Sequence, residues 1–260
     1  MNVDTLGYLG TATLALGCAA WTAIRAAQHF DRLFPAPAND ASGFHGGAAA
    51  ARLPHGVSMT ATALRQGLPE LPQRMRALPL DSRGYPVPFF AQRDNGAPDF
   101  RQCDSEKLAA CVYDKRCCIC GEPLGQYKAF TIDALSAVTR TSSQPPAHIE
   151  CAKFAAKACP VIEQHIGVSL VWVTRAYEAV QLDSGLIFRM AEAEQTFWYI
   201  DGRRANRDEV RSSFEDGLPA LYNAAHAKSD AAVLELDTMV ARATRCFPPH
   251  AAAASAGQPV

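Results

Sequence analysis

Two short motifs of cysteine and histidine constrain this chain more than any other feature of its sequence. Cys117 and Cys120 stand in C-x-x-C spacing, and Gly121 follows them directly. A tight turn with this spacing aims both thiolates at one point, and the glycine permits the backbone that such a turn requires. His148 and Cys151 stand in H-x-x-C spacing, where we expect the first turn of a helix. Residues three apart on a helix share a face, so the second pair can reach the same ion as the first.

The distance between the two motifs predicts a single closed site. Twenty-seven residues separate Cys120 from His148, which fits a knuckle, then a strand or hairpin, then a ligand-bearing helix. This is the order of a treble-clef zinc finger with a Cys3His site. Four protein ligands complete a tetrahedral zinc site, whereas a catalytic zinc keeps one position open for water. We therefore predict one structural Zn²⁺ bound by Cys117, Cys120, His148 and Cys151.

Other interpretations of these cysteines stay open. The four residues can instead be buried cysteines that pack as small hydrophobes beside a surface histidine, but this explains their joint spacing poorly. Cys118 is an alternative ligand that does not give the two-residue gap, and Cys159 lies at a helical spacing that favours the core over a reserve ligand. A thioredoxin-like redox motif is disfavoured, because the Gly-Glu-Pro that follows Cys120 breaks a helix.

The overall composition is typical of an ordinary globular protein in a reducing compartment. Of 260 residues, 48% are apolar and 20% are charged, so a sizeable core can form without disulfides. The nine cysteines are odd in number and unevenly spaced, which argues against a secreted disulfide framework and favours the cytoplasm. Residues 1–69, 70–160 and 161–260 carry formal charges of +1, +2 and −4. This balance excludes a purely charge-driven nucleic-acid binder but leaves room for a local basic patch.

The first 70 residues differ from the rest of the chain. Residues 6–24 carry no charge and hold many alanines, glycines and threonines, which predicts a weak hydrophobic helix. A membrane anchor is the alternative, since the segment is long enough to span a bilayer. Residues 35–58 are rich in Ala, Gly and Pro and have no periodicity, so we expect a linker.

The patterns after this extension predict an α+β fold, a treble-clef zinc module with a small antiparallel sheet and C-terminal helices. Asn95-Gly96 predicts a hairpin turn, and Asp104 is a candidate N-cap for a helix over 105–115. Further helices are expected over 147–158, from Asn206 to a C-cap at Gly217, and over 229–245. A short strand or hairpin is expected at 129–140, and strands at 167–173 and 185–200. We divide the chain into an extension (1–70), a zinc domain (71–160), an α+β subdomain (161–248) and a tail (249–260).

Five basic residues are candidates for contact with nucleic acid: Arg83, Lys128, Arg140, Lys153 and Lys157. Lys153 and Lys157 share one helix face, although solvated helix charges are the commoner explanation of such a pair. Arg83 lies in the segment Leu-Asp-Ser-Arg-Gly-Tyr-Pro. Turn chemistry explains this segment without a ligand, because Asp81 can bond its own backbone and Gly84 can take a positive φ.

Three stretches resemble a family of bacterial and phage-type zinc-binding proteins. They are LPLDSRGYPVPFF, CCICGEPLG and PPAHIECAKFAAKACP, and the later FWYIDGRRANRDEV and GLPAL look similar to the same group. The resemblance covers most of residues 75–248 and implies a common zinc-binding fold, with no activity attached. The metal-binding part is also loosely similar to the treble clefs of HNH nucleases. Those enzymes need a histidine base between the halves of the metal site, and residues 121–147 contain none.

These observations favour a binding protein over an enzyme. We expect a non-catalytic, zinc-stabilised module that binds a macromolecule, with nucleic acid slightly preferred to protein. The alternatives are a diverged HNH-like metal-dependent nuclease and a protein–protein adapter.

Overall fold

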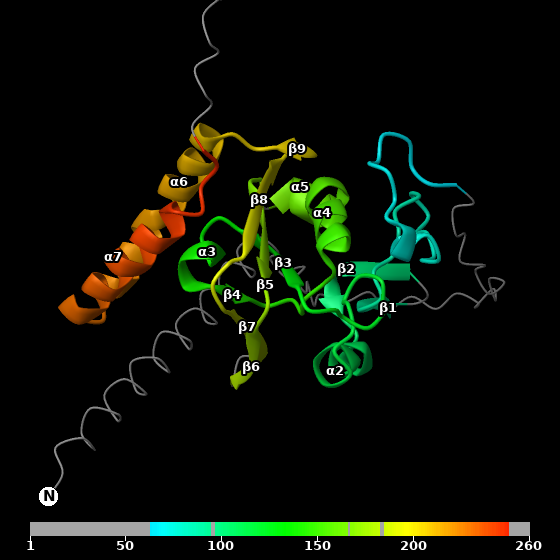
Figure 1. Cartoon of the computed structure of the whole chain (residues 1–260), viewed down its shortest axis with the longest axis horizontal. Helices are drawn as coiled ribbons and strands as arrows, with labels where there is room; N and C mark the ends of the chain where they lie inside the picture. The colour runs from blue at the N-terminus through cyan, green and yellow to red at the C-terminus, as the bar shows by residue number, and fades with distance from the viewer. Residues whose placement is uncertain (1–62, 95–96, 166, 183–184, 250–260) are drawn as a thin grey trace, which may run out of the picture.

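The computed structural model describes residues 63–94, 97–165, 167–182 and 185–249 (Figure 1). The predictions for residues 6–24, the linker at 35–58, the turn at Asn95-Gly96 and most of the tail lie outside this part of the chain. The described elements are, in order, η1 Gln73–Met75, β1 Ala91–Asp94, β2 Ala97–Cys103, α2 Ser105–Tyr113, β3 Lys128–Asp133, α3 Ser136–Thr139, β4 Thr141–Ser142, α4 Ile149–Ala158, α5 Pro160–His165, β5 Ser169–Thr174, β6 Tyr177–Leu182, β7 Gly185–Met190, β8 Gln195–Ile200, β9 Arg203–Arg204, α6 Arg207–His226 and α7 Asp230–Thr244.

The fold is mixed α and β, with small antiparallel sheets and two C-terminal helices. A four-stranded sheet in the order β3-β5-β8-β9 forms the centre, and a three-stranded sheet has the order β4-β7-β6. The hairpin β1-β2 is separate from both sheets. Helices α4 and α5 lie on one side of the central sheet, and α3, α6 and α7 lie on the other (Figure 1).

Strand β5 separates two hydrophobic cores. All six of its residues are buried, as expected of a strand covered on both faces. Because side chains alternate along a strand, Leu170 and Trp172 join the core beneath the C-terminal helices. Val171 and Val173 point to the opposite face and join the core that contains the cysteine cluster. The sheet includes strands from both sides of residue 160, and the predicted division of the chain there stays a prediction.

Several predicted elements form through local sequence signals. Asp104 caps α2 by accepting hydrogen bonds from two backbone N–H groups. The Asn206 side chain and Glu209 form a complete capping box at the start of α6. In the turn before β1, Oδ1 of Asp81 accepts from the N–H groups of Arg83 and Tyr85 at 2.9 and 2.8 Å.

Other predicted boundaries are wrong. Helix α6 does not end at Gly217 but continues to His226. A Cβ on Gly217 would lie 2.4 Å from Cδ1 of Leu135, so this glycine permits close packing against the loop before α3. The segment expected as strand or hairpin over 129–140 is a strand followed by the short helix α3. Strand β6 was not predicted.

In the part of the chain that the structure describes, no helix is both long and apolar enough to cross a membrane. The predicted cytoplasmic location stays a prediction.

Candidate metal centre

The first pair of ligands lies in a tight backbone turn. The Cys117 N–H donates to the Glu122 carbonyl at 2.8 Å, and the Gly121 N–H donates to the Cys117 carbonyl at 2.9 Å. Gly121 has a φ of +78°, which confirms the expected need for glycine, and a Cβ there would lie 2.8 Å from Cδ2 of Phe89. The turn is therefore fixed both by its own hydrogen bonds and by the aromatic ring packed against it.

Backbone pairing brings the second pair of ligands to the same place. Ala129 at the start of β3 and Ala147 exchange two hydrogen bonds of 2.9 and 2.8 Å. His148 follows immediately as the N-cap of α4, and Cys151 lies in the first turn of that helix. The helix N-terminus favours a thiolate at this position, because its free N–H groups carry partial positive charge.

The ligand atoms of Cys117, Cys120, His148 and Cys151 all lie within 4.8 Å of one another. Sγ of Cys120 lies 3.3 Å from Nδ1 of His148. The backbone N–H groups of Cys120 and His148 both donate to Sγ of Cys117 at 3.4 Å. Cys117 and Cys151 are 0% exposed, so half of the cluster is closed to solvent. This group can hold one metal ion.

A backbone acceptor fixes the histidine ring. Nε2 of His148 lies 3.0 Å from the Pro123 carbonyl oxygen, which can only accept a hydrogen bond. The neutral ring therefore carries its proton on Nε2, which leaves Nδ1, 3.3 Å from Sγ of Cys120, as the nitrogen that can bind an ion. Orientation of a ligating imidazole through its other nitrogen is typical of metal sites.

The crowding of the ligands perturbs their protonation. Hydrogen bonds from Cys120 and Cys151 lower the pKa of the Cys117 thiol, whereas hydrogen bonds with Cys117 and Cys120 raise the pKa of Cys151. The pKa of His148 rises to about 10, mainly through its hydrogen bond with Cys117. Without an ion the four groups must share protons to offset the thiolate charge, and a divalent cation performs the same role without them.

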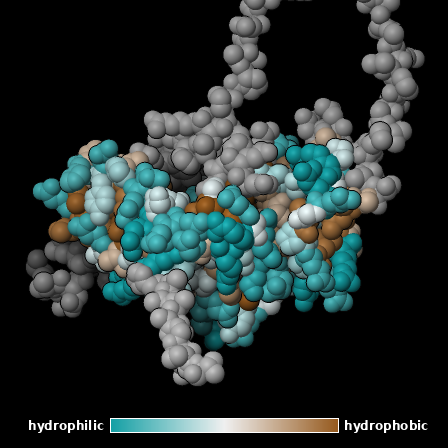
Figure 2. Space-filling model, turned by 90° about the horizontal axis from the view of Figure 1, so that it is seen from above, coloured by the Kyte–Doolittle hydropathy of each residue, from teal (hydrophilic) through white to brown (hydrophobic). Residues whose placement is uncertain are grey.

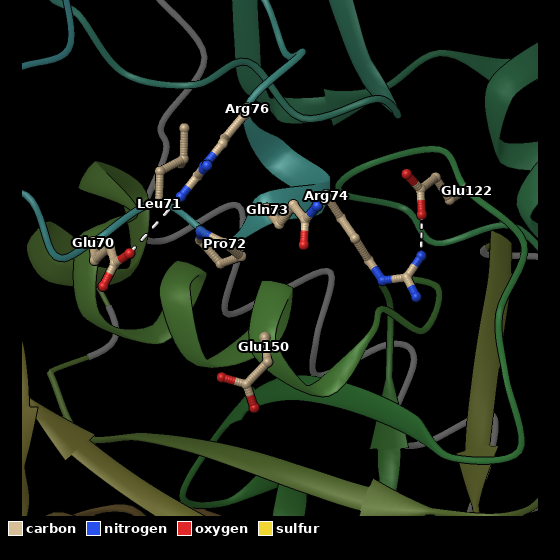
Figure 3. A pocket seen from close by; sticks show the side chains of 8 residues that line it. All are labelled: Glu70, Leu71, Pro72, Gln73, Arg74, Arg76, Glu122 and Glu150. Carbon is tan, nitrogen blue, oxygen red and sulfur yellow. Dashed lines mark hydrogen bonds and ion pairs between the residues drawn. The ribbon is translucent and has the colours of Figure 1, made fainter.

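An arginine that sequence reasoning missed lies beside the cluster. Arg74 forms an ion pair with Glu122, and its pKa is raised first by Glu122 and then by Cys120 and Cys151. The pair borders a hollow of about 730 Å³ whose wall also includes Glu150 of α4 (Figure 3). Arg74 and Glu122 are 48 residues apart, so no local pattern signals their contact. The guanidinium lies where it can offset negative charge on Cys120 and Cys151 when these side chains are thiolates.

The two alternative cysteines are outside the four-residue cluster. Cys118 is buried, and its N–H donates to the Pro146 carbonyl at 3.1 Å while its own carbonyl accepts from Phe90 at 3.0 Å. Burial raises its pKa well above the usual range. Cys159 is the C-cap of α4, and burial likewise raises its pKa. Cys118 thus packs in the core and connects the turn to its surroundings, whereas Cys159 closes the end of α4 through its N–H, which donates to the Ala155 carbonyl at 2.9 Å.

The five predicted nucleic-acid contacts fall into two groups. Lys153 and Lys157 are on α4, and Arg83 lies in the turn before β1, where its side chain pairs with Asp81 at 2.9 Å. Lys128 and Arg140 are engaged elsewhere. Nζ of Lys128 donates to two backbone carbonyls at 3.0 and 3.2 Å, and Arg140 pairs with a glutamate at 2.8 Å.

No protein-family model, no curated protein and no solved structure matches this chain.

Proposed function

We propose that this protein is a non-catalytic, zinc-stabilised module that binds nucleic acid. The observation that carries the proposal is the Cys3His cluster at the start of α4. An ion held there fixes the helix that carries Lys153 and Lys157. Nucleic acid would then bind to the surface that this helix helps to form.

Zinc is the metal that fits the donors best. Three thiolates and one imidazole are soft and borderline ligands, and four of them in a compact group suit a tetrahedral ion. Magnesium and calcium prefer oxygen ligands, and none of the four residues offers a carboxylate. The order of the elements supports a treble clef, since a knuckle leads to β3, and β3 pairs with Ala147 immediately before the ligand-bearing helix.

A structural role for the ion is favoured over catalysis. Four protein donors leave no coordination position for a water or a phosphate oxygen. The intervening segment 121–147 also lacks the histidine base that HNH nucleases use. Both observations count against the nuclease alternative.

Nucleic acid is favoured over a protein partner by the surface chemistry. Seen from above the view of Figure 1, the described surface is mostly hydrophilic, and its hydrophobic residues form separate areas (Figure 2). A protein-docking surface often shows a contiguous apolar patch instead. Two of the predicted basic contacts, Lys153 and Lys157, lie on α4, which is the helix that begins at the metal site.

The test begins with the metal content of the full chain, purified without chelator and measured by mass spectrometry. We expect about one zinc per chain. Binding of labelled 20-nucleotide strands, followed by fluorescence anisotropy, should then weaken with salt. Three neutralised phosphates on a single strand give a slope of about −2, or roughly twentyfold between 50 and 200 mM salt. Absence of binding at 50 mM salt would refute the nucleic-acid proposal, and cleavage of the strands by the zinc-loaded protein would favour the nuclease.

A further inference from the structure

Two groups of cations lie over aromatic rings near α4. In the first group, the Arg204 guanidinium lies 4.8 Å from the ring centroid of Phe197 and 5.0 Å from that of Tyr199. Nζ of Lys153 lies 4.3 Å from the same Phe197 centroid. Strands β8 and β9 supply the rings and the arginine, and α4 supplies the lysine.

The second group lies in the segment before β1. The guanidinium groups of Arg65 and Arg83 each lie 5.2 Å from the ring centroid of Tyr85. Arg83 is also 5.7 Å from the centroid of Phe100 in β2. Asp81 holds Arg83 in place through contacts of 2.9 Å to its side chain, so this guanidinium is fixed before any ligand arrives.

Helix α4 lies between the two groups. On one side, the segment before β1 borders the helix, because Glu70, Arg74 and Arg76 line one hollow together with Glu150 of α4 (Figure 3). On the other side, the turn before β9 contacts the helix, because a Cβ on Gly202 would lie 3.2 Å from the Lys157 carbonyl oxygen. We call this surface, formed by Arg65, Arg83, Lys153, Lys157 and Arg204, the stacked-cation face.

We propose that the stacked-cation face binds single-stranded nucleic acid, with bases stacking on its guanidinium planes and phosphates on its lysines. This inference rests on the proposed function and names its substrate class and surface. A guanidinium that lies on an aromatic ring leaves its outer face for a base and its N–H edges for phosphate oxygens. Arg65, Arg83 and Arg204 are exposed and can offer these faces.

The charges on this face favour a single strand over a duplex. Glu150 pairs with Lys153 at 3.0 Å, and Glu209 pairs with the neighbouring Arg203, so carboxylates offset part of the basic charge. Among the residues that the structure describes, neither Arg65 nor Arg204 forms an ion pair. Few free cations in a chain of net charge −1 give little affinity for a duplex backbone. Stacking supplies the missing affinity only where bases are unpaired.

The experiment compares binding of a labelled 20-nucleotide dT strand and a matched dA·dT duplex to the full, zinc-loaded chain by fluorescence anisotropy. Arg204→Ala should weaken binding of the single strand about fivefold or more, as loss of a stacking partner does. Arg204→Lys keeps the charge but not the plane, so it should recover only part of this loss. Arg65→Ala tests the second group in the same way.

Arg242→Ala is the matched control, because Arg242 is an exposed arginine on α7, away from this face. It should bind the strand like the unaltered chain. Zinc content and a thermal melt check that each variant is folded. If the unaltered chain binds the strand but Arg204→Ala and Arg65→Ala bind as tightly as Arg242→Ala, the face is wrong while the proposed function stands. Equal or tighter binding of the duplex overturns the single-strand assignment, and failure to bind either probe overturns the proposed function itself.

Discussion

Replacement of one residue of the Cys3His cluster, Cys120→Ser, should destabilise the part of the protein that contains this cluster. A serine hydroxyl is a poor zinc ligand at neutral pH, so the closed four-donor site becomes a three-donor site. The matched control is Cys246→Ser, because Cys246 is a partly buried cysteine outside the cluster. Its backbone carbonyl accepts from the Trp198 indole at 2.7 Å, and the substitution leaves this contact unchanged.

The size of the effect follows from linkage between binding and folding. An ion present at 1,000 times its dissociation constant contributes about 4 kcal/mol to the folded state. For a chain of 150–250 residues, 1 kcal/mol corresponds to roughly 2–4 °C in Tm, so complete loss of the ion lowers Tm by about 8–16 °C. Structural zinc sites in isolated peptides contribute about 10–16 kcal/mol, which exceeds the total stability of most domains. At that limit residues 78–160 unfold outright.

Thermal melts by circular dichroism and hydrogen exchange by mass spectrometry measure the two parts of this prediction. The turn at 115–124 and helix α4 should lose protection in Cys120→Ser, since their core contains the buried Cys117 and Cys151. The hairpin of α6 and α7 packs in the other core and should keep more of its protection. An unchanged melt and unchanged exchange in Cys120→Ser, relative to Cys246→Ser, would refute a structural metal site.

Two further predictions concern residues around the cluster. Gly121→Ala should cost about 1–3 kcal/mol in urea denaturation, because its φ of +78° strains an L-residue and the new Cβ would approach Phe89 to 2.8 Å; an unchanged midpoint would show that the turn adapts freely. Burial raises the pKa of Cys103 to about 11, so the folded thiol stays neutral at pH 8 and should react slowly with a thiol reagent. The buried neutral thiol of Cys103 contributes fully to the free energy of unfolding below the unfolded pKa of about 8.5, and this contribution declines as the pH rises toward 11. The unaltered chain should therefore lose stability between pH 8 and 10 more steeply than Cys103→Ala, and equal slopes in the two proteins would contradict this assignment.

Local signals in the sequence were enough to place the cluster and several helix starts. Each pair of candidate ligands has a short spacing, and the regular geometry of a turn or a helix places both members of such a pair side by side. The structure brings all four residues together. The Asn206–Glu209 capping box and the Asp81 turn depend on neighbours within four residues, so the sequence contains all their partners. Such features need no knowledge of the tertiary fold.

Features that depend on distant partners were not predictable in the same way. Gly217 looks like a helix stop, yet α6 continues through it, and the glycine instead leaves the space that the Leu135 side chain occupies. Strand β6 has only intermediate and exposed side chains, so its sequence lacks the apolar run that marks a buried strand. Arg74 is held beside the cluster by its ion pair with Glu122, which is 48 residues away in sequence. The contacts of Gly217 and Arg74 therefore involve residues far away in sequence, whereas β6 pairs with the neighbouring β7 and lacks only the apolar pattern.

The position of α4 links the metal to the surface proposed for binding. Its first turn carries Cys151, and the outward side chains of its next two turns include Lys153 and Lys157. Its buried side, which includes Phe154, packs in the core with Val171 and Val173 of the central sheet. An ion at the N-terminus of the helix would therefore fix its orientation relative to Phe197 and Arg204, which belong to the same sheet. Under the proposed function, zinc would be required for binding without touching the nucleic acid, because it would hold Lys153 and Lys157 in place relative to Arg204.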